Sequence, residues 1–154
     1  MEQHKQHQHN EPIIITDSEL CRSVYYPDKQ IIRSVYSGVA SHARNRQLFY
    51  EHLENAVQFA KKHTVKGVII DIRKIVGSFV QVLQRLDEEY YPIMKERSGF
   101  THEAIVVPDD LIIKHLSMKL VDLLAHQQVT GKIFYDYSEA EKWLLQQITN
   151  GAEE

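Results

Sequence analysis

The chain of 154 residues has a single cysteine, Cys21, and no long hydrophobic run. One cysteine leaves no partner for a disulfide within the chain, and no signal-peptide pattern is present, so we expect a reducing, cytoplasmic setting. The longest apolar runs are only a few residues long, whereas a helix needs roughly 20 apolar residues to cross a bilayer. The sequence therefore predicts no membrane span.

An excess of charge of either sign is also missing. Lys and Arg number 18 against 21 Asp and Glu, which gives a formal net charge of −3. This balance differs from the strongly basic surfaces that bind nucleic-acid phosphates, so we expect no nucleic-acid partner. Hydrophobic residues make up 43% of the chain and charged residues 25%, which is typical of a folded globular protein. The length suits one domain.

Motifs for common catalytic sites are absent as well. The sequence contains no G-x-G-x-x-G, no G-x-x-x-x-G-K and no H-E-x-x-H, so dinucleotide, nucleotide and zinc-protease sites lack support. The histidines are scattered, and no serine or cysteine lies in a recognisable catalytic arrangement with one of them. We therefore predict a protein that is not an enzyme and has no cofactor, with an enzyme of another kind as the third possibility.

Residues 1–12 are polar, rich in Gln and His, and without periodicity. They predict a disordered tail followed by a single domain at 13–150. His4, His7 and His9 lack the cysteine or carboxylate partners and the fixed scaffold of a specific metal site. A solvated tail is therefore favoured over a metal site, although adventitious nickel or zinc binding stays open.

Runs of β-branched and apolar residues predict the strands. The runs at 20–26 and 31–38 flank the turn at 27–30 and indicate an antiparallel hairpin. The continuous apolar runs at 67–72 and 104–107 are typical of buried parallel strands, and 132–135 completes the set. His102 and Glu103 are predicted to lie in a solvated loop before the second of these runs.

Capping signals predict where three of four helices begin. Ser41 precedes a helical pattern that runs to about residue 62. Asp109 or Asp110 precedes the third helix. Ser138 begins an S-x-x-E capping box before the last helix, which ends near residue 150. Strands and helices thus alternate after the hairpin. We predict an α/β fold with a mixed sheet of about five strands, an antiparallel hairpin followed by βα repeats, and about four helices.

The second helix is predicted to open at Gly77 and Ser78. Pro92 should end or kink it near Tyr90, because proline lacks the N–H donor and its ring clashes with the preceding turn. Tyr90 and Met94 could line an apolar ligand pocket or a partner surface, but their helical spacing favours packing in the core.

Three segments carry a resemblance to a known family: 66–73 (KGVIIDIR), 104–111 (AIVVPDDL) and 132–144 (KIFYDYSEAEKWL). Together with the element order, they resemble the STAS domain, which has the SpoIIAA-like fold of anti-sigma-factor antagonists. The likeness is closer to small bacterial STAS-like proteins of unassigned function, which are often grouped with lipid-transfer-like domains. It covers about residues 20–148.

The resemblance implies a non-enzymatic module that binds a protein partner, with a possible regulatory role. In the antagonists, a strand ending in Asp precedes a loop whose Ser is phosphorylated, and Asp71 and Ser78 occupy similar places here. The surface around Ser78 and the second helix would then be the contact face. A homodimer, formed through an exposed hairpin edge or a helix face, is also expected. The alternative function is a carrier of a lipid or another small molecule.

The residues around Ser78 also permit an interpretation without the family. A serine at a helix N-terminus favours a phosphate or another anion there, and Arg73 and Lys74 would add positive charge. An ordinary helix cap is the favoured alternative for Ser78. For Asp71, a functional carboxylate and one satisfied locally by Arg73 are equally supported, since a buried carboxylate needs a partner in either case.

Overall fold

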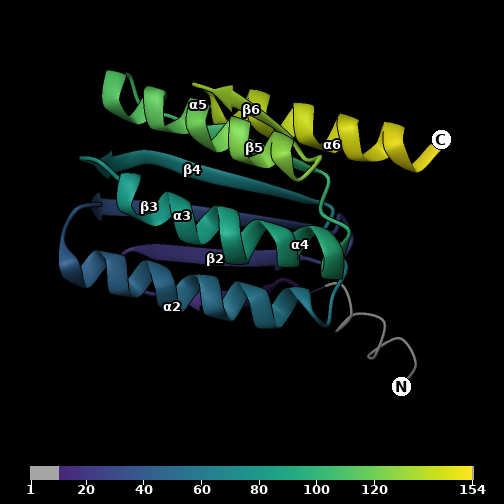
Figure 1. Ribbon diagram of the computed structural model, residues 1–154. Helices are drawn as coiled ribbons and strands as arrows, with labels where there is room; N and C mark the ends of the chain where they lie inside the picture. The colour runs from purple at the N-terminus through teal and green to yellow at the C-terminus, as the bar shows by residue number, and fades with distance from the viewer. Residues whose placement is uncertain (1–10, 154) are drawn as a thin grey trace.

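The structure, a computed structural model, describes residues 11–153, so most of the predicted tail lies outside the described residues. A single six-stranded sheet organises the described chain, with helices on both of its faces (Figure 1). The strands are β1 (Ile13–Asp17), β2 (Cys21–Tyr26), β3 (Ile31–Val39), β4 (Gly67–Val76), β5 (His102–Val106) and β6 (Thr130–Phe134).

The strands lie in the sheet in the order in which they occur along the chain. β1, β2 and β3 pair antiparallel, and β3 to β6 pair parallel. The predicted mixed sheet is confirmed, and so is the interior position of 67–72, because β4 lies between β3 and β5. Parallel pairing of these strands requires long crossover connections, and the intervening helices supply them.

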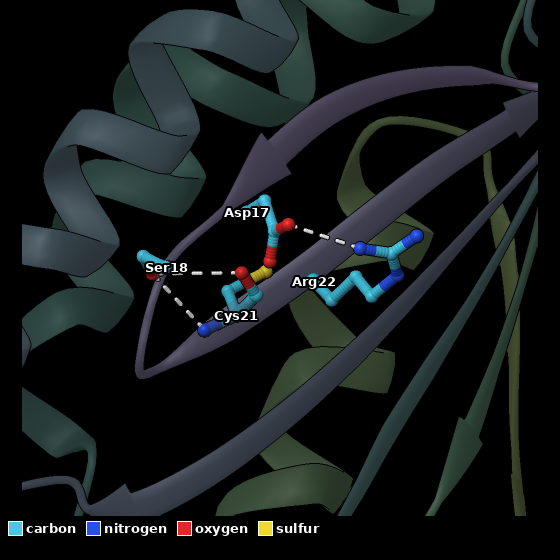
Figure 2. Close-up of polar contacts among 4 residues, drawn as sticks. All are labelled: Asp17, Ser18, Cys21 and Arg22. Atoms are coloured by element: carbon cyan, nitrogen blue, oxygen red, sulfur yellow. Dashed lines mark hydrogen bonds and ion pairs between the residues drawn. The ribbon is translucent and has the colours of Figure 1, made fainter.

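β1 is a strand beyond the five that were expected. It pairs with β2 through a short turn in which Ser18 Oγ accepts a hydrogen bond from the Cys21 N–H at 3.2 Å (Figure 2). Beside the turn, Arg22 Nη1 lies 3.0 Å from Asp17 Oδ2. This ion pair joins two residues that face each other in the β1–β2 register, and because both side chains are exposed it adds little stability. The apolar run at 13–15 was too short to predict a strand by itself.

The helical segments are α2 (Ala43–Ala60), η1 (Val80–Val82), α3 (Leu83–Arg85), η2 (Leu86–Tyr90), α4 (Tyr91–Ser98), α5 (Leu111–His126) and α6 (Tyr137–Glu153). All of them except α6 cover one face of the sheet, where the larger buried cluster lies. α6 packs alone on the other face over β4, β5 and β6. It lies so close to β4 that a Cβ added at Gly67 would lie 2.6 Å from Ile148 Cδ1.

The sequence predicts that Pro92 ends or kinks the helix, and the structure has a change of helix type there. The chain passes through the π-helical turn η2 immediately before α4, and Pro92 lies in the first turn of α4. Since proline has no N–H, the helix gives up its regular hydrogen bond there, and the wider π-turn accommodates the loss. The start of this segment also differs from the prediction, because the first regular turn is η1 at Val80 rather than a helix from Gly77.

Two of the predicted helix caps are wrong. α2 begins after His42, whose side chain makes no capping hydrogen bond, while Asn45 Nδ2 donates to the Val39 carbonyl at 2.8 Å. The last helix begins one residue before Ser138, since Asp136 Oδ2 accepts from the Glu139 N–H at 2.9 Å. The cap at Asp110 is confirmed, with Oδ1 accepting from the Ile113 N–H at 3.0 Å.

We expect Asp136→Ala to lower the free energy of unfolding by about 1 kcal/mol, the usual cost of losing an N-cap. Ser138→Ala is the matched control, because Ser138 lies inside the first turn of α6 rather than at its cap. It should change stability by only a few tenths of a kcal/mol. Urea denaturation of both variants measures the difference. An equal loss in the two variants would contradict the assignment of Asp136 as the cap.

Candidate functional site

A cavity of about 80 Å³ lies between the sheet and the helices of the larger cluster. Its walls are mainly aliphatic and aromatic side chains from β3, β4, α2 and the η1–η2 segment, including Tyr36, Phe49, Ile70, Phe79 and Val82. Protein cores are normally packed with few voids larger than a water molecule. An apolar hollow with a few polar groups in its lining is typical of a small-molecule site.

The two ends of the cavity differ in exposure. We call the half-buried end the mouth; it consists of Ala40, Asn45, Arg46 and Phe79. Arg46 Nη1 donates a hydrogen bond to Gln81 Oε1, which links the first turn of α2 to η1 beside the mouth. A second link between the same two helical layers is the Arg85 guanidinium, 4.4 Å from the centroid of the Tyr50 ring.

The buried end, which we call the floor, contains Val68, Tyr91 and Glu103. Glu103 and Val68 lie opposite each other on β5 and β4. Tyr91 Oη donates a hydrogen bond to Glu103 Oε2 at 3.2 Å. The Glu103 side chain is only 2% exposed. Sequence reasoning therefore misplaced Glu103, which belongs to a strand and points into the protein.

Burial governs the charge of the floor. It raises the pKa of Glu103 to about 8, and the hydrogen bond from Tyr91 reduces that rise only in part. Burial also raises the pKa of the Tyr36, Tyr90 and Tyr91 hydroxyls. Near neutral pH the floor is therefore mostly uncharged, with a protonated carboxyl that both donates and accepts hydrogen bonds.

A buried histidine lies next to the cavity wall but serves the fold. His52 on α2 packs on the rings of Tyr36 and Phe49, and its Nδ1 lies 2.8 Å from Thr16 Oγ1. Asn55 Nδ2 donates to the same Thr16 oxygen at 3.2 Å, which leaves the Thr16 hydroxyl to donate its proton to Nδ1. Burial lowers the pKa of His52 to about 4. The neutral imidazole thus fastens β1 to α2.

Asp71 lies away from the cavity, on the face of the sheet that α6 covers in part. Its carboxylate accepts hydrogen bonds from Arg73 Nε at 3.0 Å, from Arg73 Nη2 at 2.8 Å and from the Arg73 N–H at 3.1 Å. Burial alone would raise the pKa of Asp71, but the contacts with Arg73 and the nearby Lys74 charge lower it below its usual value. The local partner that the sequence offered as one alternative is therefore present.

The loop after β4 places Ser78 at the start of η1. Ser78 Oγ accepts a hydrogen bond from the Val80 N–H at 3.2 Å, although the N-cap position of η1 is Phe79. Gly77 has a φ of +85°, a conformation that favours glycine at this turn. Arg73 is engaged by Asp71, while Lys74 is exposed. An anion or a phosphoserine at Ser78 stays a prediction.

Tyr90 and Met94 have separate places. Tyr90 lines the cavity, whereas Met94 is fully buried in the core and is not part of the lining. The alternation of Glu103 and Ile105 along β5, which Val107 continues just after the strand, is the one sequence signal that could have placed Glu103 inside, because alternate residues of a strand share a face.

The described part of the chain has neither a cluster of metal-binding side chains nor a helix suited to span a membrane. Within residues 11–153, no three His, Cys, Asp or Glu side chains gather as a metal site would require. The helices of the same part include none that combines the length and apolar character needed to cross a bilayer. Comparisons with protein-family models, with curated proteins and with solved structures find no match to this chain.

Proposed function

We propose that this protein binds a small, largely apolar molecule in the cavity between the sheet and the helices. The observation that supports it is the cavity itself: about 80 Å³ of space with mainly apolar walls and hydrogen-bonding groups at both the mouth and the floor. This combination is common in ligand sites and uncommon in a well-packed core. It favours the small-molecule carrier over the partner-binding module that the STAS resemblance implies.

The volume sets the size of the molecule. A buried water needs roughly 10–15 Å³ of such space, so the cavity offers room for about six waters. An organic ligand of similar bulk has about six to eight non-hydrogen atoms. A short chain or a single ring would thus fill the cavity, and a longer chain would extend past the mouth.

The test is binding of benzene, a probe without polar groups, followed by NMR of the lining methyl groups. Val68→Phe places a ring on the floor and should weaken benzene binding at least tenfold. Val35→Phe is the matched control, because Val35 is 43% exposed on the neighbouring strand β3 and does not line the cavity. It should leave binding unchanged. Equal binding by the two variants would contradict the proposal.

Native mass spectrometry of the protein purified from its own host supplies a second readout. A bound small molecule that is lost in Val68→Phe and kept in Val35→Phe supports a carrier. A bound protein with no small molecule would favour the partner-binding function instead. Both variants exchange the same residue types, so the comparison controls for the added ring itself, and a thermal melt of Val68→Phe shows whether the fold is kept.

A further inference from the structure

The floor of the cavity carries a carboxyl whose hydrogen-bonding capacity is only partly used. Among the described residues, the bond from Tyr91 Oη to Oε2 is the one that the Glu103 carboxyl makes. Oε1 is therefore available to a second partner. Glu103 is also among the residues that line the cavity, so a molecule bound there can reach this carboxyl.

The groups around Glu103 supply no positive charge. Those that interact with it electrostatically are Tyr91 on α4, Tyr90 on η2 and Tyr36 on β3, all of them hydroxyls. The cation in the cavity lining is Arg46, at the mouth, where Gln81 holds its guanidinium. A ligand carboxylate at the floor would thus face another carboxyl without a counter-ion. A ligand ammonium would require Glu103 to ionise in an apolar environment, which is itself unfavourable.

These contacts indicate what chemical group the floor accepts, provided that the cavity binds a small molecule as proposed above. We infer that the ligand is held by one uncharged hydrogen-bonding group, a hydroxyl or a carbonyl, which pairs with the Glu103 carboxyl while the rest of the molecule is apolar. The protonated carboxyl donates to a carbonyl oxygen or to a hydroxyl oxygen, and Oε1 accepts from a hydroxyl. Tyr91 holds the carboxyl in place.

The experiment compares four probes of similar size at pH 6: 1-hexanol, hexanoate, hexylamine and benzene. Calorimetric titration of the wild type should give the tightest binding for 1-hexanol, at least tenfold tighter than for hexanoate or hexylamine. Glu103→Leu removes the polar group at nearly constant bulk. It should weaken 1-hexanol about fivefold, the effect of one hydrogen bond, and leave benzene within twofold. Glu103→Gln keeps a donor and an acceptor, so 1-hexanol should stay within threefold.

Each other result decides against the inference in a specific way. Tightest binding of hexylamine would show that Glu103 acts as a carboxylate. Tightest binding of hexanoate would place the head group at the mouth, beside Arg46. Equal losses of 1-hexanol and benzene in Glu103→Leu would show that the carboxyl makes no specific contact. Failure of all four probes to bind the wild type would instead overturn the proposed function itself.

Discussion

Replacing Glu103 with Gln is expected to stabilise the protein by about 4 to 5 kcal/mol at pH 8 and above, and to change little at pH 4.5. The carboxyl has a pKa of about 8 in the folded protein, against the ordinary value of 4.5. Between these values the folded state keeps a proton that the unfolded state has lost. Each pH unit then costs about 1.4 kcal/mol of stability as pH rises. Gln removes this penalty because it does not ionise.

Urea denaturation of the wild type and Glu103→Gln between pH 4.5 and 9 measures the effect as a difference between the two. The Glu103 contribution is fully present below pH 4.5 and is lost as the pH rises through 8. Glu51→Gln is the control, since it removes a carboxyl from an exposed position on α2. Its difference from the wild type should not grow with pH. Parallel pH profiles for the wild type and Glu103→Gln would show that the floor is not as isolated from water as the structure indicates.

Most of the strands could be predicted because their signals are local. The runs at 67–72 and 104–107 are almost entirely apolar, which at that length is typical of a buried parallel strand. β1 was missed because three isoleucines followed by two polar residues are too short a run to favour a strand over a loop. β1 pairs with β2 through the short turn at Ser18. The sequence of this turn gives no clear indication of a hairpin.

The helix boundaries show where local signals compete. Ser138 and Asp136 are both good caps, and both precede the same helical pattern. Asp136 prevails in the structure, where its carboxylate bonds the Glu139 N–H and also suits the positive end of the helix dipole. The S-x-x-E pattern that begins at Ser138 is therefore present in the sequence, but it lies inside α6 and does not cap it. Pro92 was located correctly as a disturbance of the helix, but the sequence pattern did not predict that the disturbance is the π-helical turn η2.

The cavity could not be predicted, because no local pattern encodes it. Its lining combines α2, β3, β4, the η1–η2 segment and β5, and the floor brings Val68, Tyr91 and Glu103 together from three separate parts of the chain. Sequence patterns indicated that Tyr90 faces inward but not whether space is left beside it. That space depends on how closely the helices approach the sheet, which is a property of the packed structure alone.

As the pH falls, His52 is expected to lower the free energy of unfolding, whereas Glu103 raises it. The imidazole has a pKa of about 4 in the folded protein, against the ordinary value of 6.5. Its contribution to stability is fully present above pH 6.5 and is lost as the pH falls toward 4. Over that range His52 is protonated in the unfolded state but stays neutral in the folded state. The loss amounts to about 3 kcal/mol.

The two groups together predict a distinctive profile for the wild type. Between pH 4.5 and 6.5 the slopes from Glu103 and His52 have opposite signs and similar size, so the contributions of these two groups to the free energy of unfolding should nearly cancel there. Above pH 6.5 the Glu103 slope acts alone. In Glu103→Gln the free energy of unfolding should therefore rise by about 3 kcal/mol from pH 4 to 6.5, because of His52. In His52→Gln the free energy of unfolding should fall continuously by about 4 to 5 kcal/mol from pH 4.5 to 8, because of Glu103.

His52→Gln loses ring packing against Tyr36 and Phe49, so it should be less stable than the wild type at pH 7. That deficit should shrink by about 3 kcal/mol on going to pH 4, because the penalty for keeping the ring neutral is gone. His115→Gln, on the exposed side of α5, is the control and should show a constant difference from the wild type. A deficit of His52→Gln that stays constant from pH 7 to 4 would mean that the ring takes up a proton without unfolding. The folded protein would then tolerate loss of the hydrogen bond that the Thr16 hydroxyl donates to Nδ1. The contact between β1 and α2 would not require a neutral His52.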